Sequence, residues 1–191
     1  SLAGIDLHGL ETLPMEEWTI PFWQRASSFG KILKAHAGEF GPAENVEQAV
    51  TQLNVRRIQH GIRASESEEV MDLLLDKDVT LDLCPISNYK LRVVDELATH
   101  PIRSFMDRGI RCTVSTDDPL SFNNSLTQEY ETLVGKLGFS VGEIGRLAKN
   151  GFSVADLESG ETTAYQRQID EIVENLLGSG CGKECPIGMY L

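Results

Sequence analysis

Short apolar runs rich in β-branched residues recur along the first two thirds of the chain, and each run ends in polar residues. Runs of this length with polar ends are typical of strands buried inside a parallel sheet. The segments between them have the character of helices, so strand and helix alternate. The five predicted strands are residues 3–7, 32–36, 57–60, 79–84 and 110–116.

Start and stop signals support the intervening helices. The signals are Pro21 and Pro42 as first-turn prolines, Ser65 with Glu68 as a capping box, and Gly30 and Gly109 as helix stops. Alternation of strand and helix predicts βαβ units and a parallel sheet covered by helices. An open doubly wound sheet and a (β/α)8 barrel both satisfy this pattern, and periodicity alone does not choose between them.

The pattern changes after Pro119, where three helical segments follow without a strand between them, at residues 126–137, 141–149 and 162–177. Ser140 with Glu143 forms a second predicted capping box. We therefore expect residues 1–151 to form the barrel part, residues 152–178 a helical extension of the same domain, and residues 179–191 a flexible tail.

Composition narrows the class of protein. The chain has 191 residues, of which 41% are hydrophobic and 24% charged, as in ordinary globular proteins. Its formal net charge of -12 and the lack of a Lys or Arg cluster argue against nucleic acid and anionic membranes as partners. No apolar run approaches the roughly 20 residues of a membrane span, and the first residues lack signal-peptide features. These observations predict a cytoplasmic protein.

The four cysteines do not suggest a disulfide framework. Cys84 and Cys112 lie in strand-like runs, while Cys181 and Cys185 lie near the C-terminal end. Reduced thiols are expected. The C-terminal pair is a weak candidate for metal binding, because no second pair of ligands accompanies it.

Groups that bind metals or move protons follow four of the predicted strands. They are Asp6 and His8, then His36 and Glu39, then His60, and finally Asp117 and Asp118. A single histidine at a strand end is more often structural, and adjacent carboxylates are often a solvated turn or a helix cap. Because a barrel builds its site at the carboxyl ends of several strands, the set together predicts a functional site.

The sequence His-Ala-Gly-Glu at residues 36–39 resembles the zinc-binding histidine and catalytic glutamate of the adenosine and adenine deaminase family. Four further motifs resemble that family in the same order, at residues 4–9, 57–61, 84–88 and 115–119. Five ordered motifs are far more specific than one. The resemblance extends to about Gly151 and implies a partial (β/α)8 TIM barrel, about its last five strands, with C-terminal helices.

The resemblance also implies roles for individual residues. His36 and Asp117 correspond to ligands of one Zn²⁺ ion, which makes bound water acidic enough to act as a nucleophile near neutral pH. Glu39 corresponds to the proton shuttle to ring N1 of a purine, a task that calls for a raised carboxyl pKa. His60 corresponds to the residue that orients or deprotonates the attacking water.

Substrate contacts follow from the same comparison of motifs. The backbone N–H of Gly9 corresponds to a contact with purine N3, and Asp118 to a contact with N7. Two histidines receive no role: His8 stands where family members vary, and His100 precedes Pro101 at a helix start, where a surface position is expected.

One feature departs from the family pattern. The family begins with a strand that carries His-x-His, and this chain contains no such motif. Two further histidine ligands are therefore expected from a missing N-terminal segment, since a catalytic zinc site takes three or more protein ligands. The chain is also shorter than the roughly 250 residues of a whole barrel. We expect it to associate with the missing part or with itself.

The expected activity is zinc-dependent hydrolysis of the 6-amino group of adenosine-type nucleosides, giving an inosine-type product and ammonia. Residues 84–94 resemble adenine deaminases, whereas residues 117–130 resemble nucleoside deaminases over a longer loop. Adenine deaminase and a truncated, non-catalytic purine-binding relative remain alternatives. A third alternative, hydrolysis of another ring amine or amide on the same barrel, is disfavoured by the His-Ala-Gly-Glu motif.

Overall fold

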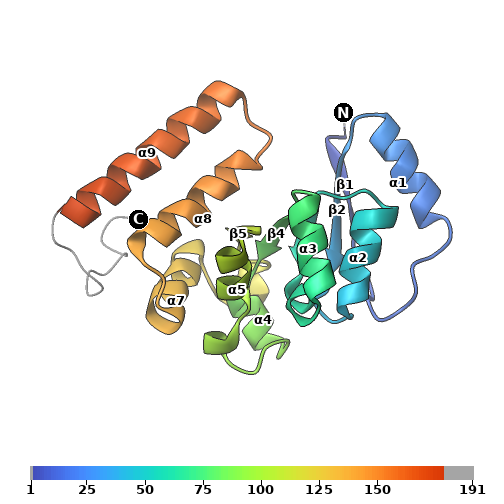
Figure 1. The fold of residues 1–191 in the computed structure, drawn as a ribbon, viewed down its shortest axis with the longest axis horizontal. Coiled ribbons are helices and arrows are strands. Elements are labelled where there is room, and N and C mark those ends of the chain that lie inside the picture. The colour runs from blue at the N-terminus through green and yellow to red at the C-terminus, as the bar shows by residue number, and fades with distance from the viewer. Residues whose placement is uncertain (1, 179–191) are drawn as a thin grey trace. The chain divides into compact units, whose positions relative to one another are not determined.

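A computed structural model describes residues 2–178 (Figure 1). The chain splits into two compact units. The first unit contains the chain up to Leu83 together with His100–Cys112, and the second contains Cys84–Thr99 and the chain from Thr113 onward. The predicted tail and the Cys181 and Cys185 pair lie outside the described residues.

All five predicted strands are present, with shorter ends in most cases. They are β1 (Gly4–Leu7), β2 (Ile32–Ala37), β3 (Arg57–His60), β4 (Thr80–Leu83) and β5 (Arg111–Val114), in the sheet order β1-β2-β3-β4-β5. The pairs β1 with β2, β2 with β3, and β3 with β4 are parallel. Sheet order equal to chain order is what successive βαβ units produce.

Strand β2 shows how the sheet separates its two faces. Leu33, Ala35 and Ala37 are buried, whereas Lys34 and His36 alternate with them and are half-buried. Because successive side chains of a strand point to opposite faces, one face of β2 is apolar and the other carries the titratable groups.

The helices of the first unit are α1 (Thr19–Ser28), α2 (Ala43–Gln52), η1 (Ile62–Glu66), α3 (Glu68–Asp76) and α5 (Ile102–Arg108). Of these, α1 and α2 contact β2. Figure 1 shows α2 and α3 side by side, and they contribute Val46, Val50, Val70 and Leu74 to the core. Apolar residues spaced by three or four positions bury one stripe of each helix.

Three helix signals are confirmed in this unit. Gly30 follows the last residue of the α1 cap with φ 65°, and Gly109 caps α5 with φ 94°, so both helices end at a left-handed glycine. Pro21 lies in the first turn of α1.

Two signals are wrong. Pro42 occupies the N-cap of α2, one residue before the helix. Ser67 caps α3, its hydroxyl accepting from the N–H of Val70 at 3.3 Å, while Ser65 lies inside η1 and donates to the carbonyl of Ile62. The 3₁₀ turn η1 uses the residues predicted to open α3, so the helix begins later.

Two further residues of this unit have distinct environments. His100 is only 3% exposed and its Nδ1 accepts from the N–H of Ile102 at 3.2 Å, so the expected surface position is wrong. The buried imidazole of His100 therefore accepts a hydrogen bond from the first N–H of α5. Cys112 is buried and forms no disulfide bond. The same holds for Cys84 of the second unit, in agreement with the expected reduced thiols.

The second unit is helical, as the sequence predicts beyond Pro119. Its helices are α4 (Pro85–Lys90), η2 (Leu97–Thr99), α6 (Pro119–Phe122), α7 (Leu126–Leu137), α8 (Val141–Ser153) and α9 (Ser159–Gly178). The family-like motif at residues 84–88 therefore includes the N-cap and the first turn of α4. Among residues 2–178, no helix has the length and apolar character needed to cross a membrane.

Helices α8 and α9 run antiparallel side by side in Figure 1. The rings of Phe152 and Tyr165 stack across this pair at 4.6 Å. The capping box predicted for α8 is confirmed, since the hydroxyl of Ser140 accepts from the N–H of Glu143 and the Glu143 carboxylate accepts from the N–H of Ser140 at 2.8 Å.

Candidate functional site

His36 lies near the carboxyl end of β2, on the polar face of the strand. Its Nδ1 is 3.2 Å from Oδ1 of Asp6 on β1, and its ring meets that of His8 edge-on with centroids 4.5 Å apart. A carboxylate at one ring nitrogen fixes the orientation of an imidazole and makes the other nitrogen a better metal ligand. The contact with Asp6 therefore supports the predicted role of His36 as a metal ligand.

Glu39 and His60 form a buried acid and imidazole pair. The Oε1 atom of Glu39 lies 3.5 Å from Nδ1 of His60, and the side chains are 10% and 3% exposed. The ring of His60 is 5.5 Å from that of His36. The first unit therefore brings together three of the predicted site residues, Glu39, His60 and His36.

Backbone geometry directs His60 to this position. Strand alternation assigns His60 to the face of Ile58, opposite His36, because His36 pairs with Gln59 in register. His60 instead has φ 63°, which ends the alternation at the strand terminus. Left-handed backbone is uncommon outside glycine, and such residues cluster at functional sites.

Two glycines allow the loops after β2 and β3 to approach each other. Gly38 has φ 70°, and a Cβ added there would lie 2.5 Å from Cγ2 of Val46 and 3.4 Å from the Cα of Gly61. Gly61 has φ 67°, and its Cβ would lie 2.7 Å from Leu81. Only glycine fits these positions without displacing neighbours.

Gly9, predicted to contact the substrate, lies in the exposed loop after β1. Its φ is 155°, and no atom lies within 4 Å of the place where a Cβ would stand. The loop therefore presents an uncovered backbone, which suits a contact with a ligand. The contact with purine N3 stays a prediction.

Asp117 and Asp118 belong to the second unit. Asp117 follows β5 with φ 60°, and its Oδ2 accepts a 2.6 Å hydrogen bond from the hydroxyl of Ser87. Asp118 is the N-cap of α6: its carboxylate accepts from the hydroxyl and N–H of Ser121 and from the N–H of Leu120. The Ser121 hydroxyl and these backbone groups lower the pKa of Asp118, which favours its ionised form.

Sequence reasoning missed Glu129, a fully buried carboxylate of the second unit. It accepts from the N–H of Ile86 at 3.1 Å and from Nδ2 of Asn124 at 2.7 Å. Burial raises the pKa of Glu129 to about 7, although these hydrogen bonds oppose the rise. The available signal was its place on the apolar stripe of α7, one residue before Tyr130 and four before Leu133.

The donor atoms of the predicted ligands suit zinc, which binds imidazole nitrogen and carboxylate oxygen. The carboxylate of Asp6 beside His36 adds the outer-shell partner that zinc-bound histidines usually have. The predicted ligands are His36 and Asp117, two in number, whereas catalytic zinc sites take three or more ligands from the protein. The predicted ligands therefore suit zinc in their chemical type.

Together these features define a class: an α/β protein with imidazole and carboxylate groups at the carboxyl ends of parallel strands. The fold is a partial (β/α)8 barrel with C-terminal helices, and it matches the crystal structure of adenine deaminase from Arthrobacter aurescens with a TM-score of 0.85 at 36% identity, over 90% of this chain and 53% of that one. The chain belongs to the adenosine deaminase family, whose profile matches residues 1–172.

Other relatives are also similar to this chain. Adenine deaminase from Bordetella parapertussis is 41% identical over 128 residues, which cover 67% of this chain and 40% of that protein. An amidohydrolase from Burkholderia ambifaria, solved with bound Zn, matches with a TM-score of 0.82 at 26% identity, over 93% of this chain and 50% of the other. The chain thus spans about half the length of the relatives it matches.

Proposed function

We propose that the protein containing this chain hydrolyses the 6-amino group of a purine and releases ammonia. The observation that carries this proposal is the buried pair of Glu39 and His60 beside His36, in a chain of the adenosine deaminase family. This reaction needs a water nucleophile, a proton for ring N1 and groups that recognise the ring edge. Each requirement has a candidate residue.

Free adenine is the substrate that we propose first. The support is the name adenine deaminase on relatives that share 41% and 36% identity with this chain. An adenosine-type nucleoside is the second candidate, supported by the resemblance of residues 117–130 to nucleoside deaminases. The two substrates differ in the presence of a ribose at N9, so they need different space on that side of the ring.

The chain's own residues divide the chemistry as follows. His36 and Asp117 would hold zinc, which when bound supplies a water that loses its proton near neutral pH. Glu39, in its protonated form, would donate its proton to N1. Of the two protons of the attacking water, one would return to the Glu39 carboxylate and the other would pass to the departing amine, which leaves as ammonia. His60, 3.5 Å from Glu39, orients the attacking water and stabilises the charge that develops beside it.

Recognition of the ring edge is assigned to the remaining predicted residues. The N–H of Gly9 would meet N3. Asp118 would meet N7. Its position as the N-cap of α6 holds the carboxylate in place. Because an ionised carboxylate only accepts hydrogen bonds, this contact needs a proton at N7 or on Asp118.

We also propose that the full zinc site takes two further histidines from an upstream segment, and that this chain associates with that segment or with itself. A cytoplasmic location and the absence of nucleic-acid and membrane partners belong to the same proposal, on the basis of the net charge of -12.

The experiment that tests the function measures zinc content and deamination of adenine and adenosine, followed by ultraviolet absorbance and ammonia release. It compares this chain with a version extended upstream to include a His-x-His motif. We expect only the extended protein to hold about one zinc and to turn over. If neither protein deaminates a purine but both bind one, the non-catalytic alternative replaces the proposal.

A further inference from the structure

Glu11, in the loop after β1, reaches the loop that follows β2. Its carboxylate accepts four consecutive backbone N–H groups, those of Gly38, Glu39, Phe40 and Gly41. The last three of these hydrogen bonds measure 3.0, 2.8 and 2.9 Å. Successive N–H groups that converge on one anion form a nest, an arrangement that favours a negative charge at its centre.

The charge of Glu11 agrees with this geometry. Partial burial raises the pKa of a carboxyl, but the four backbone hydrogen bonds outweigh it and lower the pKa of Glu11 below its ordinary value. Asn45 of α2 adds a donor, with Nδ2 at 3.0 Å from the Glu11 carbonyl and 3.3 Å from its carboxylate. Glu11 is therefore ionised at neutral pH and linked to both the loop and α2.

The loop of residues 38–41 depends on an acceptor at this place. Gly38, Glu39 and Gly41 are buried, so N–H groups that lost Glu11 would have little access to water. A buried donor without a partner is unfavourable, so the loop would rearrange to satisfy these groups. Glu39 is the residue whose N–H binds Glu11 and whose carboxylate lies beside His60.

We propose that Glu11 is a positioning residue for the site: it holds the loop of residues 38–41 so that the Glu39 carboxylate meets His60. The catalytic part of this inference rests on the proposed function of Glu39. Glu11 itself faces the backbone of the loop and acts through Glu39, without a contact of its own to the reacting atoms.

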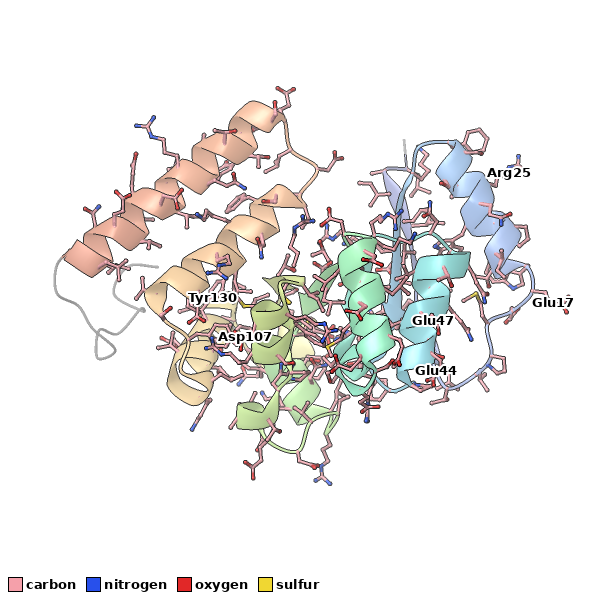
Figure 2. All side chains as sticks on the ribbon, viewed as in Figure 1. Glu17, Arg25, Glu44, Glu47, Asp107 and Tyr130 are labelled. Carbon is pink, nitrogen blue, oxygen red and sulfur yellow. The ribbon has the colours of Figure 1, made fainter. Side chains whose placement is uncertain are left out.

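The test uses the upstream-extended protein with Glu11→Gln, Glu11→Asp and the control Glu17→Gln. Gln keeps the size of the side chain but replaces one acceptor oxygen with a donor and removes the charge, whereas Asp keeps the charge on a shorter side chain. Glu17 lies six residues further along and points away from the fold in Figure 2, so its variant matches the change in charge without touching the loop.

Two measurements separate positioning from general stability. In Glu11→Gln, amide hydrogen exchange at residues 38–41 should accelerate at least about tenfold while β3 and β4 keep their protection. The value of kcat should fall at least about tenfold with KM within about twofold, because small displacements of a catalytic group cost large factors in rate. Glu11→Asp should fall between Glu11→Gln and Glu17→Gln in both measurements.

Unchanged exchange at residues 38–41 in Glu11→Gln would overturn the proposal. Uniform acceleration across the sheet would also overturn it, because Glu11 would then contribute only global stability. If the extended protein does not deaminate purines, the proposed function fails, yet selective exchange at residues 38–41 still supports the hold of Glu11 on the loop.

Discussion

His60, the last residue of β3, and Asp117, which follows β5, both have left-handed backbone, at φ 63° and 60°. A residue with a Cβ in this conformation costs on the order of 1 kcal/mol or more, and persists only where its surroundings impose it. At His60 the cost is offset by a buried position beside Glu39. Asp117, a second predicted site residue, has the same left-handed geometry.

The first prediction at this scale concerns Glu39. Glu39→Gln in the upstream-extended protein should lower turnover at least about 100-fold, because the amide keeps the hydrogen bond but cannot exchange a proton. Zinc content and KM should change little. The control is Glu44→Gln on α2, because the Glu44 side chain is exposed and is labelled in Figure 2. Steady-state kinetics with adenine measure both, and turnover equal to the control would remove Glu39 from the mechanism.

The second prediction concerns Gly61, where an added Cβ is strained and also meets Leu81 at 2.7 Å. Gly61→Ala should destabilise the fold by about 2–4 kcal/mol, the sum of backbone strain and overpacking. Gly30→Ala is the matched control, since Gly30 has φ 65° but no atom within 4 Å. That variant should lose only about 1 kcal/mol, from the backbone alone. Urea unfolding midpoints compare them, and equal losses would mean that packing against Leu81 plays no part.

Among the elements, α8 has the most complete local specification. The capping box satisfies N–H groups at the start of α8, and Leu147 of the same helix is buried in the core. The start of α8, which packs against α9, is therefore specified by residues 140–143. A change at the cap should act on the helix without touching the core.

We predict that Ser140→Ala lowers the free energy of unfolding by about 1 kcal/mol, through loss of the side-chain acceptor for the N–H of Glu143. Ser104→Ala, at an exposed position inside α5, should be neutral or slightly stabilising, because alanine has the higher helix propensity. Thermal or urea unfolding of both variants gives the comparison. A Ser140→Ala protein as stable as Ser104→Ala would show that the box contributes nothing.

At the scale of the whole molecule, the feature that bears on association is the edge strand β1. Within residues 2–178, β1 occupies one end of the strand order and pairs only with β2. Large apolar side chains are exposed in the same part of the chain, among them Leu2, Leu10, Leu13, Trp18, Phe22 and Phe29. An unpaired edge beside apolar surface favours association.

We therefore predict that the chain alone self-associates, and that an upstream segment supplied in trans or as an extension reduces this. Analytical ultracentrifugation over a range of concentrations measures it. The upstream-extended protein is the control for non-specific aggregation. A chain that stays monomeric and melts cooperatively without the upstream segment would contradict the prediction.

The stability of the fold should also depend on pH through His100. Burial, together with the nearby His60, lowers the pKa of His100 to about 3, below the ordinary 6.5. As pH falls below about 6.5, the unfolded chain therefore binds a proton at His100 while the folded chain does not. The free energy of unfolding decreases by up to about 1.4 kcal/mol per pH unit until pH reaches about 3. His100→Asn, which keeps an acceptor for the N–H of Ile102, should show a shallower loss.

Urea unfolding at several pH values between 7 and 4 tests this difference. Other groups, Glu11 among them, titrate in both proteins and cancel in the comparison. Parallel curves for the two proteins would show that His100 is not held neutral by the fold.

The sequence by itself determined the order of strands and helices, the confirmed capping box at Ser140, and the motifs that mark the family. These features depend on residues close together in the chain, where periodicity and caps act locally. It also placed His36, Glu39 and His60 at strand ends, where parallel strands meet at one edge of a sheet.

Tertiary structure decided the rest. Glu11 meets the N–H groups of a loop about thirty residues away, His100 is buried by packing, and the helix α3 starts at Ser67 because a 3₁₀ turn precedes it. His60 reaches His36 only through its left-handed backbone. These outcomes depend on which distant groups become neighbours when apolar surface is buried, and local sequence preference does not specify those partners.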